Sequence, residues 1–179
     1  TPFTIRNNTS GNVVQYQPPR VAYDPTAGRA LVLWKEGEDI YGRLVNMRTT
    51  PPTLVGLQPF IVADGNEKQS VNYAAVAAHP LNGNFLVVYE RSETSDDVCG
   101  QFVTSSGALE GNAFEIASDA LDPDVDFYPN RRQFMVIWET LEEKEKEEKE
   151  NPSNIQGRLV EEERLGSIFG MVQNSRELD

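Results

Sequence analysis

The chain has 179 residues, a net charge of −12, a hydrophobic share of 39% and a single cysteine, Cys99. Such acidity argues against nucleic acid as a partner, because phosphate binding needs a basic stripe, and an anionic membrane surface would repel the chain. No apolar run is long enough to insert into a membrane, and one cysteine excludes a disulfide within the chain.

The first predicted strand is Pro2–Ile5, which contains Phe3 and Ile5. Asn7 and Asn8 follow it, and each begins an Asn-x-Ser/Thr triplet of the kind that accepts glycans in secreted proteins. Both a glycosylation site and a plain polar loop fit these residues. Residues 1–15 are predicted to be a surplus strand and its linker, because the repeats that follow leave this strand without partners.

Four strand patterns then recur in the same order along the chain, which is the signature of a repeat architecture. The first is a short strand that ends in proline, at Val21–Pro25, Val76–Pro80 and Val125–Pro129. The second is an apolar run that ends in an aromatic residue, at Ala30–Trp34, Phe85–Tyr89 and Phe134–Trp138. Because these runs lack polar alternation, they are predicted to be buried on both faces of a sheet.

The third pattern has a glycine at its fourth position, at Asp39–Val45, Asp97–Val103 and Asn154–Val160. Glycine inside a strand indicates a bulge or the close approach of another backbone. We therefore expect Gly42, Gly100 and Gly157 to lie at equivalent close contacts between neighbouring repeat units.

The fourth pattern surrounds a phenylalanine, at Pro59–Val62, Ala113–Ile116 and Ile168–Met171. Phe60 and Phe114 are predicted to be buried between neighbouring units. With Phe3 included, the repeated phenylalanines Phe3, Phe60, Phe114 and Phe169 are 57, 54 and 55 residues apart.

Four antiparallel strands at this spacing are typical of β-propeller blades. The predicted fold is all-β, with three tandem four-stranded antiparallel blades of β-propeller type and one surplus N-terminal strand. The expected blades are residues 16–66, 67–120 and 121–179. A Glu/Lys-rich insertion, residues 141–153, separates the second and third strands of the last blade. Since it has no apolar face, it is predicted to be a solvated loop, with an interaction segment as the alternative.

The segments Val21–Pro25, Leu31–Trp34 and Asp39–Arg43 resemble the V-A-Y-[DN]-P, L-V-V-W and D-I-Y-G-[QR]-R patterns of tandem repeats in large secreted or surface proteins. The resemblance extends over nearly the whole chain. It implies β-propeller-like blades that usually carry no enzyme chemistry, and a location outside the cell or on its surface. The second copy departs from the pattern at Ala78, His79 and Cys99, and the third departs by its insertion.

His79 is the only histidine, and it aligns with Asp24 and Tyr128 of the other copies. A position that varies in this way is predicted to be a surface turn. Four aromatic residues at strand ends fit either core packing or the sugar-stacking platform of a lectin: Tyr23, Trp34, Tyr89 and Trp138.

Asp122, Asp124 and Asp126 have the spacing of the start of an EF-hand, but Phe127 and Gln133 stand where that loop needs glycine and glutamate. A calcium site at these three aspartates and a solvated acidic turn both remain open. Apart from this calcium, no cofactor is predicted, and no side chains form a catalytic pattern.

Three blades do not close a propeller. The surplus strand, with Phe3 and Ile5, is therefore predicted to pair with strands of another chain or a distant repeat. The leading hypothesis is a non-catalytic structural or assembly protein, outside the cell or on its surface, that exchanges strands with copies of itself to form a ring or a filament. The alternative is a lectin-like β-propeller module that binds glycans.

Overall fold

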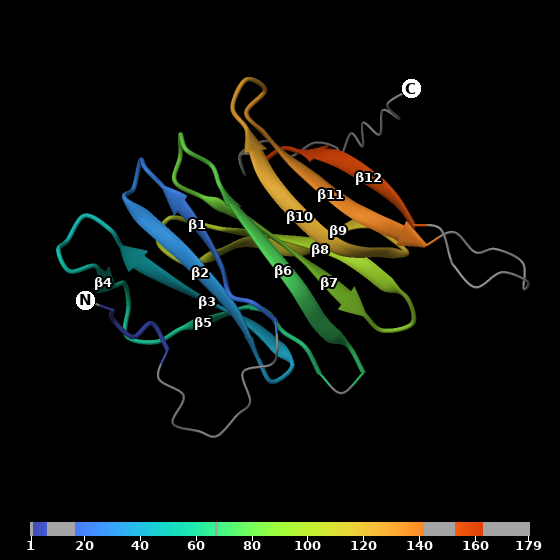
Figure 1. Ribbon diagram of the computed structural model, residues 1–179, viewed down its shortest axis with the longest axis horizontal. Coiled ribbons are helices and arrows are strands. Elements are labelled where there is room, and N and C mark those ends of the chain that lie inside the picture. The colour runs from blue at the N-terminus through green and yellow to red at the C-terminus, as the bar shows by residue number, and fades with distance from the viewer. Residues whose placement is uncertain (1, 7–16, 67, 142–152, 163–179) are drawn as a thin grey trace, which may run out of the picture.

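The computed structural model describes residues 2–6, 17–66, 68–141 and 153–162 (Figure 1). Within these ranges the chain forms β-strands and no helix, and all strand pairs are antiparallel, which confirms the all-β prediction. No described segment is therefore a helix that could cross a membrane.

Sheet 1 consists of β1 (Arg20–Asp24), β2 (Arg29–Glu36), β3 (Asp39–Asn46), β4 (Thr53–Leu54) and β5 (Phe60–Ala63). Strands β1, β2 and β3 are neighbours in that order, and both β4 and β5 pair with β3. These two short strands together form one interrupted fourth strand. Pro59 precedes β5, and its missing N–H prevents it from extending the ladder.

Sheet 2 consists, in spatial order, of β6 (Ser70–Ala78), β7 (Phe85–Ser92), β8 (Asp96–Val103) and β9 (Leu109–Ala117). Sheet 3 consists of β10 (Ala120–Tyr128), β11 (Gln133–Leu141) and β12 (Ser153–Val160). The charged insertion lies between β11 and β12 in the sequence. Residues 142–152 and the predicted strand Ile168–Met171 lie outside the described residues.

Neighbouring sheets pack face to face through two hydrophobic clusters. The first lies between sheets 1 and 2, and the second lies between sheets 2 and 3. Successive residues of β7 alternate between them: Phe85, Val87 and Tyr89 belong to the first, while Leu86 and Val88 belong to the second. All five are at most 3% exposed, which confirms that this strand is buried on both faces. Each contributes about 1.5–3 kcal/mol by its removal from water.

The three sheets share one register around the repeated glycine. Leu33 pairs with Gly42 in sheet 1, Val88 with Gly100 in sheet 2, and Ile137 with Gly157 in sheet 3. The first strands also lie together, because β6 contacts both β1 and β10. The described sheets form an open row, with sheet 1 at one end and sheet 3 at the other (Figure 1).

The repeated glycines make close contacts, but not the contacts predicted. A Cβ atom on Gly42 would lie 3.0 Å from the Phe60 ring, and one on Gly100 would lie 2.8 Å from the Phe114 ring. Each phenylalanine is the partner of its glycine on the adjacent strand, so the close approach occurs within one sheet and not between two. Around Gly157 the nearest atoms belong to β11 instead.

Phe60 and Phe114 are half-buried, not buried as predicted. Each ring lies at the margin of an inter-sheet cluster, where it covers its glycine and packs against the next sheet. The prediction placed them correctly at the boundary between units. It overestimated their burial because a fourth strand forms the outer edge of its sheet.

Residues 2–6 form no strand with the other described strands, because the outer edge of β3, the nearest ladder, is already occupied by β4 and β5. Their predicted pairing with another chain or a distant repeat stays a prediction. Phe3 is 40% exposed.

Candidate functional site

The outer face of sheet 3 presents apolar side chains to solvent. Met135, Ile137 and Ile155 are 38%, 41% and 66% exposed, and Leu159 is half-buried. They point away from the second cluster because they alternate along β11 and β12 with its buried members. We call the surface formed by these four residues the outer face of sheet 3.

Residues at the same positions of the other two sheets are fully covered. The shared register aligns Met135, Ile137 and Ile155 with Leu31, Leu33 and Ile40 of sheet 1, and with Leu86, Val88 and Val98 of sheet 2. These six equivalents are at most 1% exposed, because the following sheet packs on them. The outer face of sheet 3 thus has apolar side chains on β11 and β12, as an inter-sheet face does, but it also carries the exposed Asp124 and Asp126 of β10, where sheet 2 has Ala75 and Ala77. No following sheet covers this face among the described residues.

Residues 2–6 lie against sheet 1 in a way that repeats a contact elsewhere in the chain. Arg43 Nη1 donates a hydrogen bond to the carbonyl oxygen of Ile5 at 3.3 Å, and Arg158 Nη1 donates one to the carbonyl oxygen of Ile116 at 3.0 Å. Both arginines directly follow the repeated glycine, and both isoleucines lie two residues after the repeated phenylalanine. Residues 2–6 therefore occupy the place that β9 of a preceding sheet would occupy.

An ion pair also holds this segment to sheet 1. The Arg6 guanidinium donates two hydrogen bonds to the Glu36 carboxylate, at 2.7 Å and 2.9 Å, and Trp34 Nε1 donates a third at 3.2 Å. The bond from Arg6 is the main reason that the pKa of Glu36 lies below its ordinary value. Because Glu36 is buried, this bidentate pair is stronger than a typical surface ion pair.

In sheets 1 and 2, the residue after the repeated aromatic reaches toward the first strand of the next sheet. Lys35 Nζ donates to the carbonyl oxygen of Val71 at 2.8 Å and to Asn72 Oδ1 at 2.6 Å. Glu90 Oε1 accepts the backbone N–H of Asp122 at 2.6 Å, at a bulge where Asp122 has a φ of 49°. Burial lowers the pKa of Lys35 and raises the pKa of Glu90 to about 7.

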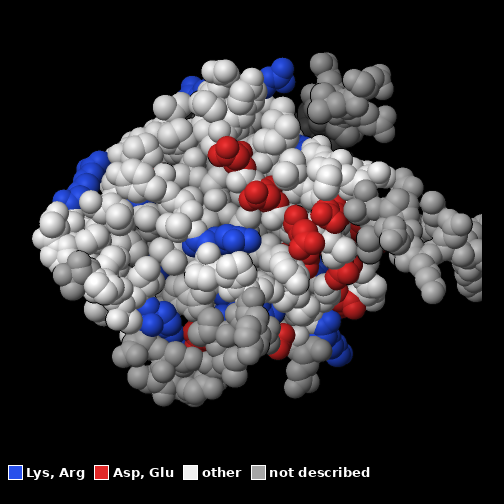
Figure 2. Space-filling model, in the orientation of Figure 1, with Lys and Arg blue, Asp and Glu red and all other residues white. Residues whose placement is uncertain are grey.

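The three aspartates predicted as a calcium site are exposed along β10. Asp124 and Asp126 share one face of the strand, as expected from their spacing, since they pair with Ile137 and Met135. Among the described residues, however, no three metal-binding side chains lie close enough together to hold an ion. Figure 2 shows a band of acidic side chains in the part of the surface where β10 lies.

His79 is buried, so its interpretation as a surface turn residue was wrong. Its ring lies 4.4 Å from that of Phe127 and 6.0 Å from that of Phe134, between sheets 2 and 3. Nδ1 accepts the backbone N–H of Leu81 at 3.3 Å. Burial is the main cause of a lowered His79 pKa. The surrounding hydrophobic rings fit a packing role.

Three of the four aromatic residues considered as sugar platforms are buried in the core: Trp34, Tyr89 and Trp138. Their faces are not accessible to a ligand, which agrees with the core-packing interpretation. Tyr23 is exposed on the solvent side of sheet 1. The glycosylation candidates Asn7 and Asn8 lie outside the described residues.

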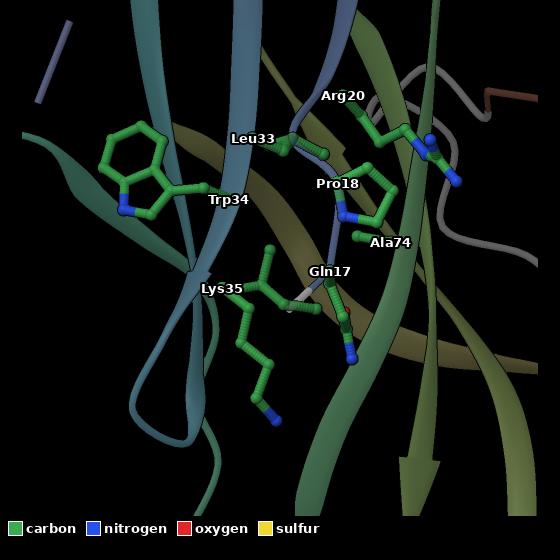
Figure 3. Close-up of a pocket in the computed structure, with 8 residues that line it drawn as sticks. Gln17, Pro18, Arg20, Leu33, Trp34, Lys35 and Ala74 are labelled. Atoms are coloured by element: carbon green, nitrogen blue, oxygen red, sulfur yellow. The ribbon is translucent and has the colours of Figure 1, made fainter. Parts of the chain in front are cut away.

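One small pocket lies where β1, β2 and β6 meet, lined in part by Gln17, Trp34, Lys35 and Ala74 (Figure 3). Its volume is about 10 Å³, roughly enough for one water molecule. Small-molecule sites are typically tens of times larger. The pocket is therefore a packing gap beside the buried Lys35 ammonium and no candidate ligand site.

Comparison with known proteins adds no family. No protein-family model matches the chain, and no curated protein matches it significantly.

Proposed function

We propose that the three sheets are blades of a β-propeller-type array, and that the protein is a non-catalytic structural protein that assembles with copies of itself. The outer face of sheet 3 carries this proposal, because its two equivalents in the chain are both covered by a following sheet. The resemblance of the repeats to those of large secreted or surface proteins supports a location outside the cell or on its surface.

The free energy gained by covering this face alone is too small to hold two chains together. Covering the exposed parts of Met135, Ile137 and Ile155 would contribute about 2–5 kcal/mol, if roughly half of each side chain's transfer free energy remains to be gained. Bringing two chains together costs about 4–15 kcal/mol. Stable assembly therefore needs a further contribution, and the pairing of an added strand, with Phe3 and Ile5, would supply it.

Such a contact joins one end of a chain to the other end of its neighbour. A contact of this heterologous type closes into a ring when the rotation between chains permits it, and otherwise extends into a filament. Both forms agree with the proposal.

The test is the size of the protein in solution as a function of concentration, measured by light scattering. We expect the unaltered chain to associate, and Ile137→Lys to shift association to at least about tenfold higher concentration, because it places a charge in the covered face. Leu81→Lys is the control, since Leu81 is exposed in the turn between β6 and β7. A chain that stays monomeric at high concentration would refute the proposal.

A further inference from the structure

The N-terminal segment resembles a fourth strand without a sheet, and β12 is the edge of a sheet that has three described strands. We infer that residues 2–6 form the fourth strand of sheet 3 in a second copy of this chain, where they pair with β12 and place Phe3 over Gly157. This inference rests on the proposed self-association and specifies its interface.

The segment already lies where such a strand must lie relative to sheet 1. In the chain itself, β9 pairs with β8 of its own sheet while Ile116 accepts a hydrogen bond from Arg158 of the next sheet. Ile5 accepts the equivalent bond from Arg43, and Arg6 is paired with Glu36. Residues 2–6 therefore have the contacts that a fourth strand makes with the following sheet, but lack the sheet of which they would be the fourth strand.

Sheet 3 has the complementary edge. Strands β3 and β8 each pair with a further strand on their outer side, whereas β12 pairs with β11 alone among the described strands. Gly42 and Gly100 lie under the rings of Phe60 and Phe114. Around Gly157 no described aromatic ring takes this place, and a Cβ atom there would have the carbonyl oxygen of Val136 as its nearest neighbour, at 3.2 Å.

The repeat fixes the register of the composite sheet. Because Gly42 pairs with Phe60 and Gly100 with Phe114, Gly157 is expected to pair with Phe3. One residue further, Tyr41 pairs with Ile61 and Cys99 with Glu115. The same rule places Gln156 opposite Thr4.

A second copy fits this arrangement because the two halves lie at opposite ends of the row of sheets (Figure 1). If residues 2–6 keep their contacts with their own sheet 1 while pairing with β12 of another copy, the outer face of that sheet 3 is brought onto sheet 1. Val21 and Tyr23 are exposed there. By register they are the equivalents of Val125 and Phe127, which pack into the second cluster. Strand pairing and face packing thus form one interface.

Cysteine pairing tests the register directly. One chain carries Thr4→Cys and the other Gln156→Cys, and both positions are exposed in the single chain. Directly opposed residues of antiparallel strands have Cα atoms about 4.5–5.5 Å apart, within the range of a disulfide. We expect the mixture to form a covalent heterodimer on a non-reducing gel. The native Cys99 is buried, and a Cys99→Ala background removes any contribution from it.

Thr94→Cys replaces Thr4→Cys in the matched control, because Thr94 is exposed in the turn between β7 and β8. If the control pair Thr94→Cys and Gln156→Cys formed as much covalent dimer as the pair Thr4→Cys and Gln156→Cys, the disulfide would reflect random collision of the chains, and the inference would be overturned. Phe3→Ala should weaken association by about tenfold or more, as expected for an aromatic anchor, with Leu81→Ala as its control.

The two proposals fail in different ways. If the chain associates by light scattering but Thr4 and Gln156 do not cross-link, the inference is wrong while self-association stands. The predicted strand Ile168–Met171, which lies outside the described residues, would be the natural occupant of the β12 edge in that case. If the chain is monomeric at every concentration, the proposed function itself is wrong.

Discussion

Glu90 provides a sharp test of how the sheets are joined. This carboxyl is buried between sheets 2 and 3, and burial is the largest cause that raises its pKa from 4.5 to about 7. The charges of Asp122 and Asp96 raise the pKa further, and the hydrogen bond from the Asp122 backbone N–H opposes them. Replacing Glu90 with glutamine keeps an oxygen for that N–H and removes the titration.

The sign of the effect follows from the direction of the shift. An acid whose pKa is higher in the folded state binds its proton more tightly there, so its contribution is fully present below about pH 4.5 and is lost as the pH rises through about 7. A shift of this size corresponds to about 3 kcal/mol. We therefore expect Glu90→Gln to be more stable than the unaltered protein by about this amount at pH 8, and nearly equal to it at pH 4.5.

Urea unfolding at a series of pH values measures this difference. Because the variant is compared with the unaltered protein at each pH, the opposite contribution of His79, whose pKa is lowered, cancels. Glu93→Gln is the control, since Glu93 is exposed. If Glu90→Gln showed the same pH dependence as the unaltered protein, the carboxyl would not be held in its neutral form by burial, and the reasoning would be wrong.

Three further predictions concern packing and assembly. Gly100→Val should lower the free energy of unfolding by about 1–3 kcal/mol, because its Cβ would lie 2.8 Å from the Phe114 ring; an unchanged melting temperature would contradict this. The buried His79 should destabilise the fold as it becomes charged. As the pH falls below 6.5, the melting temperature of His79→Phe should therefore decrease less than that of the unaltered protein. Deleting residues 1–12 should reduce the size of the assembly in light scattering, and an oligomer of unchanged size would rule out a role for the N-terminal strand.

The strands were predictable where hydrophobic pattern alone decides them. The apolar run Phe85–Tyr89 indicates a two-sided buried strand, and β7 is one. The first strands begin earlier than predicted, since β6 starts at Ser70 and passes a bulge where Tyr73 has a φ of 44°. Bulges place polar residues in a strand out of alternation, so the pattern does not reveal them. The two-residue strand β4 is too short to show any pattern at all.

The candidate site was less predictable, because it depends on what covers each residue. The apolar pattern of Met135 and Ile137 is the same as that of their covered equivalents, so these two residues alone do not mark the face as exposed. The paired Asp124 and Asp126 on β10 distinguish it, but their place on this face is known only from the strand register. The burial of Glu90 and His79 likewise depends on contacts between sheets that are distant in sequence. The arginine contacts with Ile5 and Ile116 are made to carbonyl oxygens, which every residue carries, so no sequence motif identifies the acceptor.

The alternation of β7 between the two clusters has a consequence for cooperativity. In stacked repeats, stability is a sum of local terms and contacts between nearest neighbours. Sheet 2 contributes to both inter-sheet clusters, whereas sheets 1 and 3 each contribute to one. Loss of sheet 2 therefore removes both contacts and unfolds the whole row, while either end sheet can open with the other contact intact. Under denaturant or mechanical load, the row should fray inward from its ends, and hydrogen exchange should be slowest in β7.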